Sequence, residues 1–345
     1  MKLLLCALMM FSLSASPKVI PVTTPAPQEG KIYPIAIVGA GAAGTMAVQR
    51  AVLNNTEVLL FSGAKRERKN SCGNWVRKVD NVPTFLKYKR AVLEMRNEVL
   101  YELVKSPLGH NLFIIEDSVC EIRNQGNYFD LVDGCGRTFS AQFVVLATGI
   151  MKEQPLIQGS IKPILGYANS QSIGYCSLCD GHRAFGKKTV VIGHTEEAAD
   201  TAMDLKNKYN LPHVPILTNG KIPTFGFEEG MVIYVEPILE IIGDAEQTQL
   251  HGFKLSSGEI VEAEFGFVSM GIRPNNRLAL QLGVELNECG LVVTDENCES
   301  SIPNLFVIGD LRANSFKQIY TAWQHAADAL IEIDCRRQKA ELPLR

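Results

Sequence analysis

The sequence predicts an α/β protein built from Rossmann-like dinucleotide-binding folds. Three observations favour this class: a GxGxxG turn between an apolar strand and a helix near residue 39, a second strand-turn-helix segment near residue 193, and two other apolar strands that end in small residues. A length of 345 residues suggests two domains. The content of 46% hydrophobic and 21% charged residues is typical of globular chains and excludes collagen, coiled coil and wholesale disorder.

The charge balance argues against nucleic acid as a partner. The chain has 34 Lys and Arg residues against 37 Asp and Glu residues, a net charge of −3, so it has no basic excess for phosphate backbones or anionic membranes. No segment after the N-terminal leader approaches the roughly 20 apolar residues of a spanning helix, so no stable membrane span is expected.

The first residues have the outline of a signal peptide, which we place at residues 1–15. Lys2 precedes an apolar run over residues 3–13, and small residues follow. A fortuitous apolar leader is the alternative. Residues 16–30 contain Pro17, Pro21, Pro25 and Pro27 and are predicted to be a proline-rich linker. Cleavage of the leader would make the protein periplasmic or secreted; otherwise it would be cytoplasmic.

The first strand-turn-helix-strand unit spans residues 32–63. In its turn, Gly39 permits a tight bend, Gly41 lets a pyrophosphate approach the backbone, and Gly44 lets the helix pack closely on the strand. An acidic residue commonly follows the second strand of such a unit, but here Ser62 occupies that place. Recognition of the ribose must therefore differ.

Two further strands end in small turns. Residues 143–147 lead into Thr148 and Gly149, and residues 305–308 lead into Gly309 and Asp310. Such strand ends line the ligand crevice of a doubly wound sheet, where Asp310 would accept hydrogen bonds from ribityl hydroxyls. Taken alone, Asp310 would be an ordinary loop aspartate.

Only two of the nine cysteines are close together, Cys176 and Cys179 in the segment CSLCDG. No second pair completes a tetrahedral zinc site, so no metal site is predicted. Within a dinucleotide-binding protein this spacing favours a redox-active disulfide, whereas for an isolated CxxC half a metal site and buried packing would remain alternatives. Asp180 would donate a proton or cap a helix, and His182 is better explained as a solvated surface residue than as a proton shuttle.

At this point the sequence resembles the low-molecular-weight thioredoxin reductase family of FAD enzymes, from about residue 31 onward. The motifs occur in the family's order: VLLFSG, Gly73-Asn74-Trp75, VVLATG, CSLCDG, GIRPN, VIGD and Lys317-Gln318-Ile319. The resemblance implies that FAD is contacted by Gly39, Gly41, Gly44, Gly73, Asn74, Asp310, Gln318 and Ile319. Ser62, Thr148, Gly149, Gly309 and Lys317 complete the predicted cofactor-binding set, and Cys176, Cys179 and Asp180 form the predicted catalytic set.

The resemblance also implies the domain map. An FAD-binding domain would comprise residues 31–152 and 272–345, with the CxxC domain inserted between them at residues 153–271. A homodimer is expected, with a thioredoxin-like protein or a small dithiol or disulfide as the substrate.

The inserted domain departs from the family at the place of its NADPH turn. Gly193 remains, but His194 and Thr195 replace small residues, and Glu196 and Glu197 follow at the start of the helix, where they would repel a diphosphate. The segment VPILTNGKIPTF, after the next strand, has no arginine to pair with a 2′-phosphate. NADPH is therefore a doubtful cofactor, whereas FAD is expected.

The predicted function is a thioredoxin-reductase-like, FAD-dependent dithiol-disulfide oxidoreductase that does not use NADPH in the ordinary way. Unusually bound NADPH, another redox protein such as a ferredoxin, and dioxygen are the conceivable electron partners. The alternatives are an oxygen-dependent dithiol oxidase and a non-catalytic flavin-binding scaffold.

Overall fold

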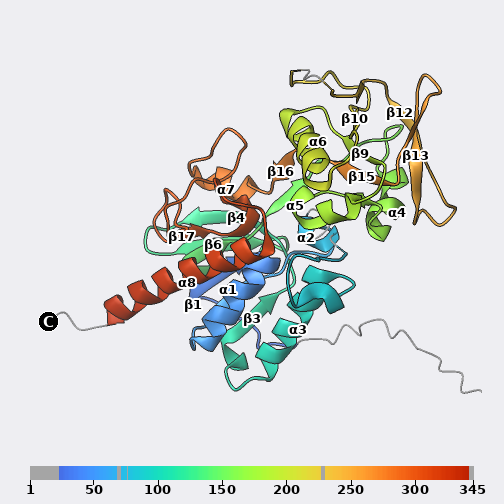
Figure 1. Cartoon of the computed structure of the whole chain (residues 1–345). Coiled ribbons are helices and arrows are strands. Elements are labelled where there is room, and N and C mark those ends of the chain that lie inside the picture. Colours follow the sequence, from blue (N-terminus) through green and yellow to red (C-terminus); the bar gives the residue numbers. More distant parts are fainter. Residues whose placement is uncertain (1–22, 68–70, 76, 227–229, 342–345) are drawn as a thin grey trace, which may run out of the picture.

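The structure is a computed structural model, and it describes residues 23–67, 71–75, 77–226 and 230–341. The predicted signal peptide and the first part of the predicted linker lie outside these residues. No helix within the described ranges has both the length and the apolar character needed to cross a membrane. The described chain forms two lobes (Figure 1).

The first lobe is built on a seven-stranded sheet with the order β3-β2-β1-β6-β5-β4, to which β17 is added beside β6. The strands are β1 (Ile32–Val38), β2 (Val58–Phe61), β3 (Leu112–Ile115), β4 (Val119–Asn124), β5 (Phe129–Asp133), β6 (Thr138–Leu146) and β17 (Leu305–Val307). The small residues of α1 (Ala42–Leu53) let this helix pack closely, and one buried cluster joins α1 to the sheet, to α3 (Ala91–Lys105) and to α8 (Ile319–Glu341). Figure 1 shows these helices together beside the sheet.

Strand β6 changes partner along its length. Its first residues pair antiparallel with β5, and its last three residues pair parallel with β17, where Val144 lies opposite Leu305. β1 pairs with β6 on the other side, so β6 is central where the parallel strands end. β17 thus lies beside the C-terminal end of β6, on the side of β6 opposite β1.

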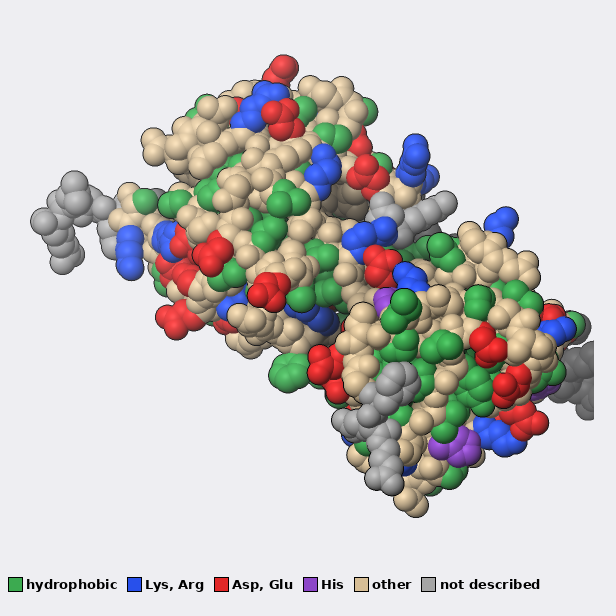
Figure 2. All heavy atoms as spheres, turned by 90° about the horizontal axis from the view of Figure 1, so that it is seen from above, with side chains coloured by type: hydrophobic (Ala, Val, Ile, Leu, Met, Phe, Trp, Pro, Cys, Tyr) green, Lys and Arg blue, Asp and Glu red, His purple; other side chains and the backbone are tan. Residues whose placement is uncertain are grey.

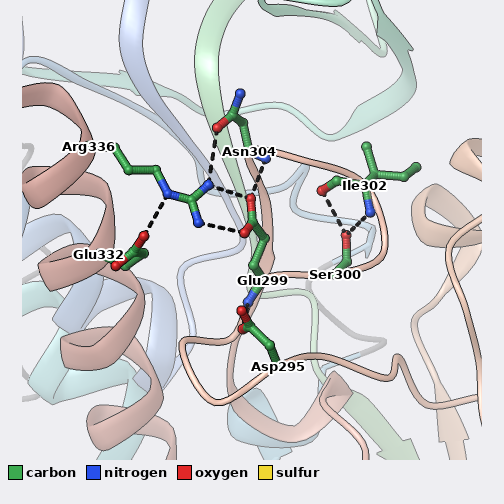
Figure 3. A network of polar contacts seen from close by, with 7 residues as sticks. All are labelled: Asp295, Glu299, Ser300, Ile302, Asn304, Glu332 and Arg336. Atoms are coloured by element: carbon green, nitrogen blue, oxygen red, sulfur yellow. Dashed lines mark hydrogen bonds and ion pairs between the residues drawn. The ribbon is translucent and has the colours of Figure 1, made fainter. Parts of the chain in front are cut away.

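A polar network anchors α8 to the segment that leads into β17 (Figure 3). The Arg336 guanidinium on α8 donates two hydrogen bonds of 2.6 Å to the Glu299 carboxylate and one of 2.7 Å to Glu332. The Asn304 backbone N–H donates to the same Glu299 carboxylate. Burial alone would raise the pKa of Glu299, but the hydrogen bonds from Arg336 and Asn304 lower it overall.

The second lobe contains a five-stranded parallel sheet with the order β11-β10-β9-β15-β8. Its strands are β8 (Ile173–Gly174), β9 (Thr189–Ile192), β10 (Ile216–Leu217), β11 (Ile233–Tyr234) and β15 (Phe265–Val268), and its longer helices are α4 (Lys162–Ser170) and α6 (Glu196–Tyr209). An antiparallel sheet of β12 (Ile238–Gly243), β13 (Leu250–Leu255) and β14 (Ile260–Glu262) flanks it and shares a buried cluster with it.

The lobes are joined by a two-stranded antiparallel ribbon of β7 (Ile150–Lys152) and β16 (Ile272–Pro274). The chain therefore passes into the second lobe and back at one place. The predicted α/β class with two Rossmann-like domains is confirmed, whereas the residue boundaries of the domains stay predictions. Figure 2 shows acidic and basic side chains mixed over both lobes on the face in view.

Candidate functional site

The three glycines of the first turn have different surroundings. A Cβ on Gly39, whose φ is +113°, would lie 2.4 Å from the Ala147 carbonyl oxygen, and a Cβ on Gly44 would lie 1.8 Å from the Gly39 carbonyl oxygen. A Cβ on Gly41 would meet no atom within 4 Å. Gly39 and Gly44 are thus required by packing within the protein, whereas Gly41 leaves space for a ligand.

Two adjoining cavities begin at this turn, with volumes of about 540 Å³ and 410 Å³. Gly41, Gly73 and Thr148 line both cavities, so together the cavities offer an extended site of the kind a dinucleotide needs. Every predicted cofactor-binding residue except Gly44 lines one cavity or both. Gly39, Ser62 and Asn74 line the smaller, and Gly149, Gly309, Asp310, Lys317, Gln318 and Ile319 line the larger.

The strand ends around the smaller cavity are held by hydrogen bonds. The Ser62 backbone N–H donates to the Ile115 carbonyl. Thr148 and Asn275 form a reciprocal pair, in which the Thr148 hydroxyl donates to the Asn275 carbonyl and the Asn275 side-chain amide donates to the Thr148 carbonyl. Asn275 was not among the predicted site residues, although its segment GIRPN was singled out in the sequence.

The Gly309–Leu311 turn (η5) carries Asp310 into the larger cavity. Burial raises the pKa of Asp310, and the Lys317 and Lys152 ammonium groups oppose this rise. The two ammonium groups offset only part of the desolvation of the Asp310 carboxyl, so this carboxyl is suited to accepting hydrogen bonds from ligand hydroxyls.

His325 on α8 is 5% exposed, and burial lowers its pKa to about 4, so it is neutral at pH 7.

Cys176 and Cys179 form a disulfide on the wall of the larger cavity. Cys176 precedes the one-turn helix α5 (Ser177–Asp180), and the Cys179 backbone N–H lies 3.2 Å from the Cys176 sulfur. The Gln318 side-chain nitrogen lies 3.5 Å from each sulfur. The structure thus brings the predicted redox pair and the predicted cofactor-binding segment at residues 317–319 to one place.

Asp180 lies on the same wall, and burial raises its pKa, while the nearby Arg183 guanidinium opposes the rise. Its side chain is 21% exposed, and its Oδ1 atom lies 3.9 Å from the Arg183 Nε atom. Arg183 also forms an ion pair with Asp80 of the first lobe, and the His182 Nε2 atom lies 3.2 Å from the same carboxylate. The 53% exposed His182 side chain matches its interpretation as a surface residue.

Several residues of the larger cavity escaped the sequence analysis. Cys72 on α2 (Cys72–Trp75) is a free thiol whose pKa burial raises to about 11, so it is a neutral thiol at pH 7. Tyr175, whose pKa burial also raises, donates a 2.6 Å hydrogen bond to Gln154. Lys152 lies in β7 beside the predicted domain boundary. A cysteine next to the Gly73-Asn74-Trp75 motif was the one available signal.

The turn between β9 and α6 differs from the turn at Gly39. A Cβ on Gly193 would lie 2.0 Å from the Ser269 carbonyl, so this glycine is retained for packing. Thr195 stands where Gly41 stands in the first turn, and the Glu197 Oε1 atom lies 3.9 Å from the Lys152 Nζ atom. The Thr224 backbone N–H donates a 2.8 Å hydrogen bond to the His194 carbonyl, which brings the loop after β10 onto this turn.

Comparisons with known proteins identify relatives along most of the chain. The family model described as pyridine nucleotide-disulphide oxidoreductase matches residues 33–326. Thioredoxin reductases of Listeria monocytogenes and Treponema pallidum are 26% and 24% identical, over 85% and 86% of this chain and 90% and 94% of theirs. The crystal structure of thioredoxin reductase from Streptococcus pyogenes has a TM-score of 0.74 at 21% identity, covering 89% of this chain and 99% of that one.

The cavities, the open position at Gly41 and the partly buried Asp310 suit an extended dinucleotide, and the disulfide lies beside them. With a family match over residues 33–326, this chain belongs to the pyridine nucleotide-disulphide oxidoreductases and is an FAD-dependent disulfide oxidoreductase of the low-molecular-weight thioredoxin reductase type.

Proposed function

We propose that Cys176 and Cys179 are the redox centre of this enzyme and exchange electrons between bound FAD and a dithiol or disulfide substrate. The observation that carries the proposal is the position of their disulfide on the wall of the larger cavity, which Gly41, Gly149 and Asp310 also line. A thioredoxin-like protein or a small dithiol or disulfide is the proposed substrate, in keeping with the names of the relatives.

In the oxidising direction, a substrate thiolate attacks one sulfur of the pair, which breaks the Cys176–Cys179 bond and forms a mixed disulfide. The second substrate thiol then attacks the substrate sulfur of the mixed disulfide. The substrate leaves as a disulfide, and the Cys176–Cys179 pair, now two thiols, has gained two electrons in total. When the Cys176–Cys179 bond re-forms, the pair gives up these two electrons, and FAD held by the cavity that Gly41, Gly149 and Asp310 line would supply the two-electron acceptor. Asp180, with its raised pKa, is proposed to hold the proton that a departing thiolate receives.

We propose that NADPH is a poor electron donor for this enzyme. Thr195 and the carboxylates of Glu196 and Glu197 surround the N-terminus of α6, and the loop at residues 218–225 supplies no guanidinium. Lys152 offsets part of the charge of Glu197, but Glu196 is exposed and no ion pair with it is found among the described residues. The hydrogen bond from Thr224 to the His194 carbonyl supports a turn closed by the protein's own loop.

The electron partner outside the protein is then another redox protein or dioxygen. In an oxygen-dependent dithiol oxidase, two electrons would pass from substrate thiols to the flavin and on to O₂, which would be reduced to hydrogen peroxide. This is the second candidate function, and the altered turn at Thr195 is the observation that favours it. A non-catalytic flavin-binding scaffold is the outcome if the cysteines prove dispensable.

Export and dimerisation complete the proposal. Cleavage of the leader at residues 1–15 would place the cysteine pair in an oxidising compartment and away from the cytoplasmic NADPH pool. Expression of the full chain in a bacterial host, followed by mass measurement of the mature N-terminus and fractionation, tests export; an intact leader in the cytoplasm contradicts it.

Light scattering of the purified protein tests the proposed homodimer, and the mass of a monomer would contradict it.

The redox role is tested by anaerobic reduction of the purified flavoprotein with dithiothreitol, with flavin absorbance as the readout. Wild-type protein should bleach, whereas Cys176→Ser and Cys179→Ser should keep their flavin but bleach at least 100-fold more slowly. The matched control is Cys335→Ser, because Cys335 is a free and exposed cysteine on α8. Unchanged bleaching and turnover in both active-site variants would leave only the scaffold function.

The NADPH proposal is tested by the same measurement of flavin absorbance. Micromolar NADPH should bleach the wild-type flavin slowly and without saturation. A Thr195→Gly, Glu196→Ala variant should bleach faster, because it reopens the turn and removes one carboxylate. Rapid and saturable bleaching of the wild-type flavin would restore conventional pyridine-nucleotide chemistry.

A further inference from the structure

Gln318 links the redox disulfide to a segment far away in the chain. The residue is 7% exposed, and its side-chain nitrogen lies 3.5 Å from the sulfurs of both Cys176 and Cys179. The carboxamide oxygen of Gln318 accepts a 2.9 Å hydrogen bond from the Asn81 side-chain nitrogen. Asn81 belongs to the segment between α2 and α3 of the first lobe, and it also lines the larger cavity.

The orientation of a carboxamide decides what it offers to its surroundings. The nitrogen end has two N–H donors and the oxygen end only accepts, and the two ends have nearly the same shape. The Gln318 oxygen also lies 3.5 Å from the Cys179 sulfur, so contact with the sulfurs alone does not select an orientation. In the structure the Asn81 nitrogen donates to the Gln318 oxygen, and this hydrogen bond is compatible with the orientation in which the Gln318 N–H groups face the sulfurs.

An N–H donor has unequal effects on the two redox states of the cysteine pair. A disulfide sulfur is a weak acceptor, whereas a thiolate is charged, and charge-assisted hydrogen bonds are roughly twice as strong as neutral ones. The Cys179 backbone N–H, 3.2 Å from the Cys176 sulfur, is the only other N–H hydrogen-bonded to these sulfurs within the described residues. The Gln318 amide is therefore a main source of stabilisation for a thiolate when the disulfide opens.

We propose that Asn81 is a positioning residue of the redox centre, which holds the Gln318 carboxamide with its N–H groups facing Cys176 and Cys179. Asn81 acts through Gln318, and among the described residues it makes no hydrogen bond of its own with either sulfur. The inference rests on the proposed function, in which these cysteines open and close during turnover.

The test measures the apparent thiol pKa of the reduced pair in the FAD-loaded protein. The pH dependence of iodoacetamide alkylation is followed by mass spectrometry of the peptide that contains both cysteines, which separates them from the other thiols. Asn81→Leu and Gln318→Leu should each raise the apparent pKa by about one unit, which is a tenfold loss of thiolate at neutral pH. The charged side chains around the cavity, among them Lys152, Asp180, Asp310 and Lys317, are unchanged in both variants.

A double variant decides whether Asn81 acts through Gln318. In the Gln318→Leu background, Asn81→Leu should raise the apparent pKa no further, because the carboxamide that it orients is already gone. Asn169→Leu is the matched control, since this amide lines the same cavity, accepts a 3.0 Å hydrogen bond from Arg77 and makes no hydrogen bond with the sulfurs. It should leave the apparent pKa at the wild-type value.

Full additivity in the double variant, or an unchanged or lowered pKa in Asn81→Leu, would overturn the proposal. Asn81→Ala serves if the leucine variant does not fold, and flavin absorbance with circular dichroism reports folding. Failure of the proposed function is recognised separately, because it appears as undiminished turnover in Cys176→Ser, whereas alkylation is read without turnover.

Discussion

A side chain at Gly44 would collide with the Gly39 carbonyl, whereas a side chain at Gly41 would meet no protein atom within 4 Å. We expect Gly41→Asp to fold but to lose FAD, because its carboxylate would enter the space left for the pyrophosphate. Two like charges about 4 Å apart at an effective dielectric constant of about 20 repel by about 4 kcal/mol, or roughly a 1,000-fold loss of affinity. Flavin absorbance of the purified variant measures this. Gly226→Asp makes the same change in an exposed loop with no neighbour within 4 Å, and it should stay yellow.

Asp180 gives a pH-dependent prediction. Burial raises its pKa above 3.8, so the folded protein keeps its proton to a higher pH than an exposed aspartate would. An acid of this kind is available below its raised pKa and is lost as the pH rises through it. Asp180→Asn should slow turnover about 100-fold at a pH below this raised pKa, and the ratio of wild-type to variant turnover should fall as the pH rises through the raised pKa. A ratio that does not change with pH, or equal rates, would remove Asp180 from the proton path; Asp204→Asn, at an exposed position, is the control.

The same raised pKa has a consequence for stability. Between the unfolded pKa and the raised folded pKa, the folded state binds more protons than the unfolded state, so this group makes the protein less stable as pH rises. The neutral His325 has the opposite dependence, since its pKa of about 4 lies below the ordinary 6.5. Its contribution is present above pH 6.5 and is lost as the pH falls toward 4.

At the scale of elements, the contact between α8 and the loop before β17 is the testable feature. Arg336→Met should lower the free energy of unfolding by about 2 kcal/mol, because it leaves the Glu299 carboxylate, 14% exposed, without its two charge-assisted hydrogen bonds. Urea denaturation measures the loss. Asp204→Ala breaks a pair that is about half exposed on α6 and should change stability by less than about 0.5 kcal/mol. Equal effects of the two substitutions would contradict a special role for the Arg336 contact.

Local patterns were sufficient to predict the elements around the site. The GxGxxG turn and the strand ends at Thr148 and Gly309 are each encoded within a few residues, and the structure places them around the same cavities. The contacts that orient the redox pair were not predictable in this way. Asn81 is 237 residues from Gln318, and no short-range pattern indicates which asparagine will meet which glutamine.

At the scale of the whole molecule, the lobes meet through Asp80 as well as through the ribbon of β7 and β16. The Asp80 carboxylate of the first lobe pairs with Arg183 and His182 of the second lobe, beside the redox helix α5. Asp80→Asn should weaken this contact by roughly 1 kcal/mol, after allowance for partial exposure. Amide hydrogen exchange over residues 177–184 should then become several-fold faster.

The control for Asp80 is Glu262→Gln, which breaks an ion pair with Lys188 inside the second lobe, where both side chains are about two-thirds exposed. Exchange over residues 177–184 should stay at the wild-type rate in this variant. If Asp80→Asn also leaves the rate unchanged, the Asp80 ion pairs do not hold the redox helix against the first lobe.

Strand β17 pairs with β6 but lies far later in the sequence, so the FAD site can be completed only late in the synthesis of the chain. β17, the Asp310 turn and the Gln318 segment come more than 150 residues after residues 41–43 and 147–149, yet they complete the site that those residues begin. The ribosome must therefore release the chain at least as far as residue 319 before a complete FAD site exists. A chain that crosses a membrane unfolded would have to acquire its flavin on the far side, so the place of folding is also the place where the cofactor must be supplied.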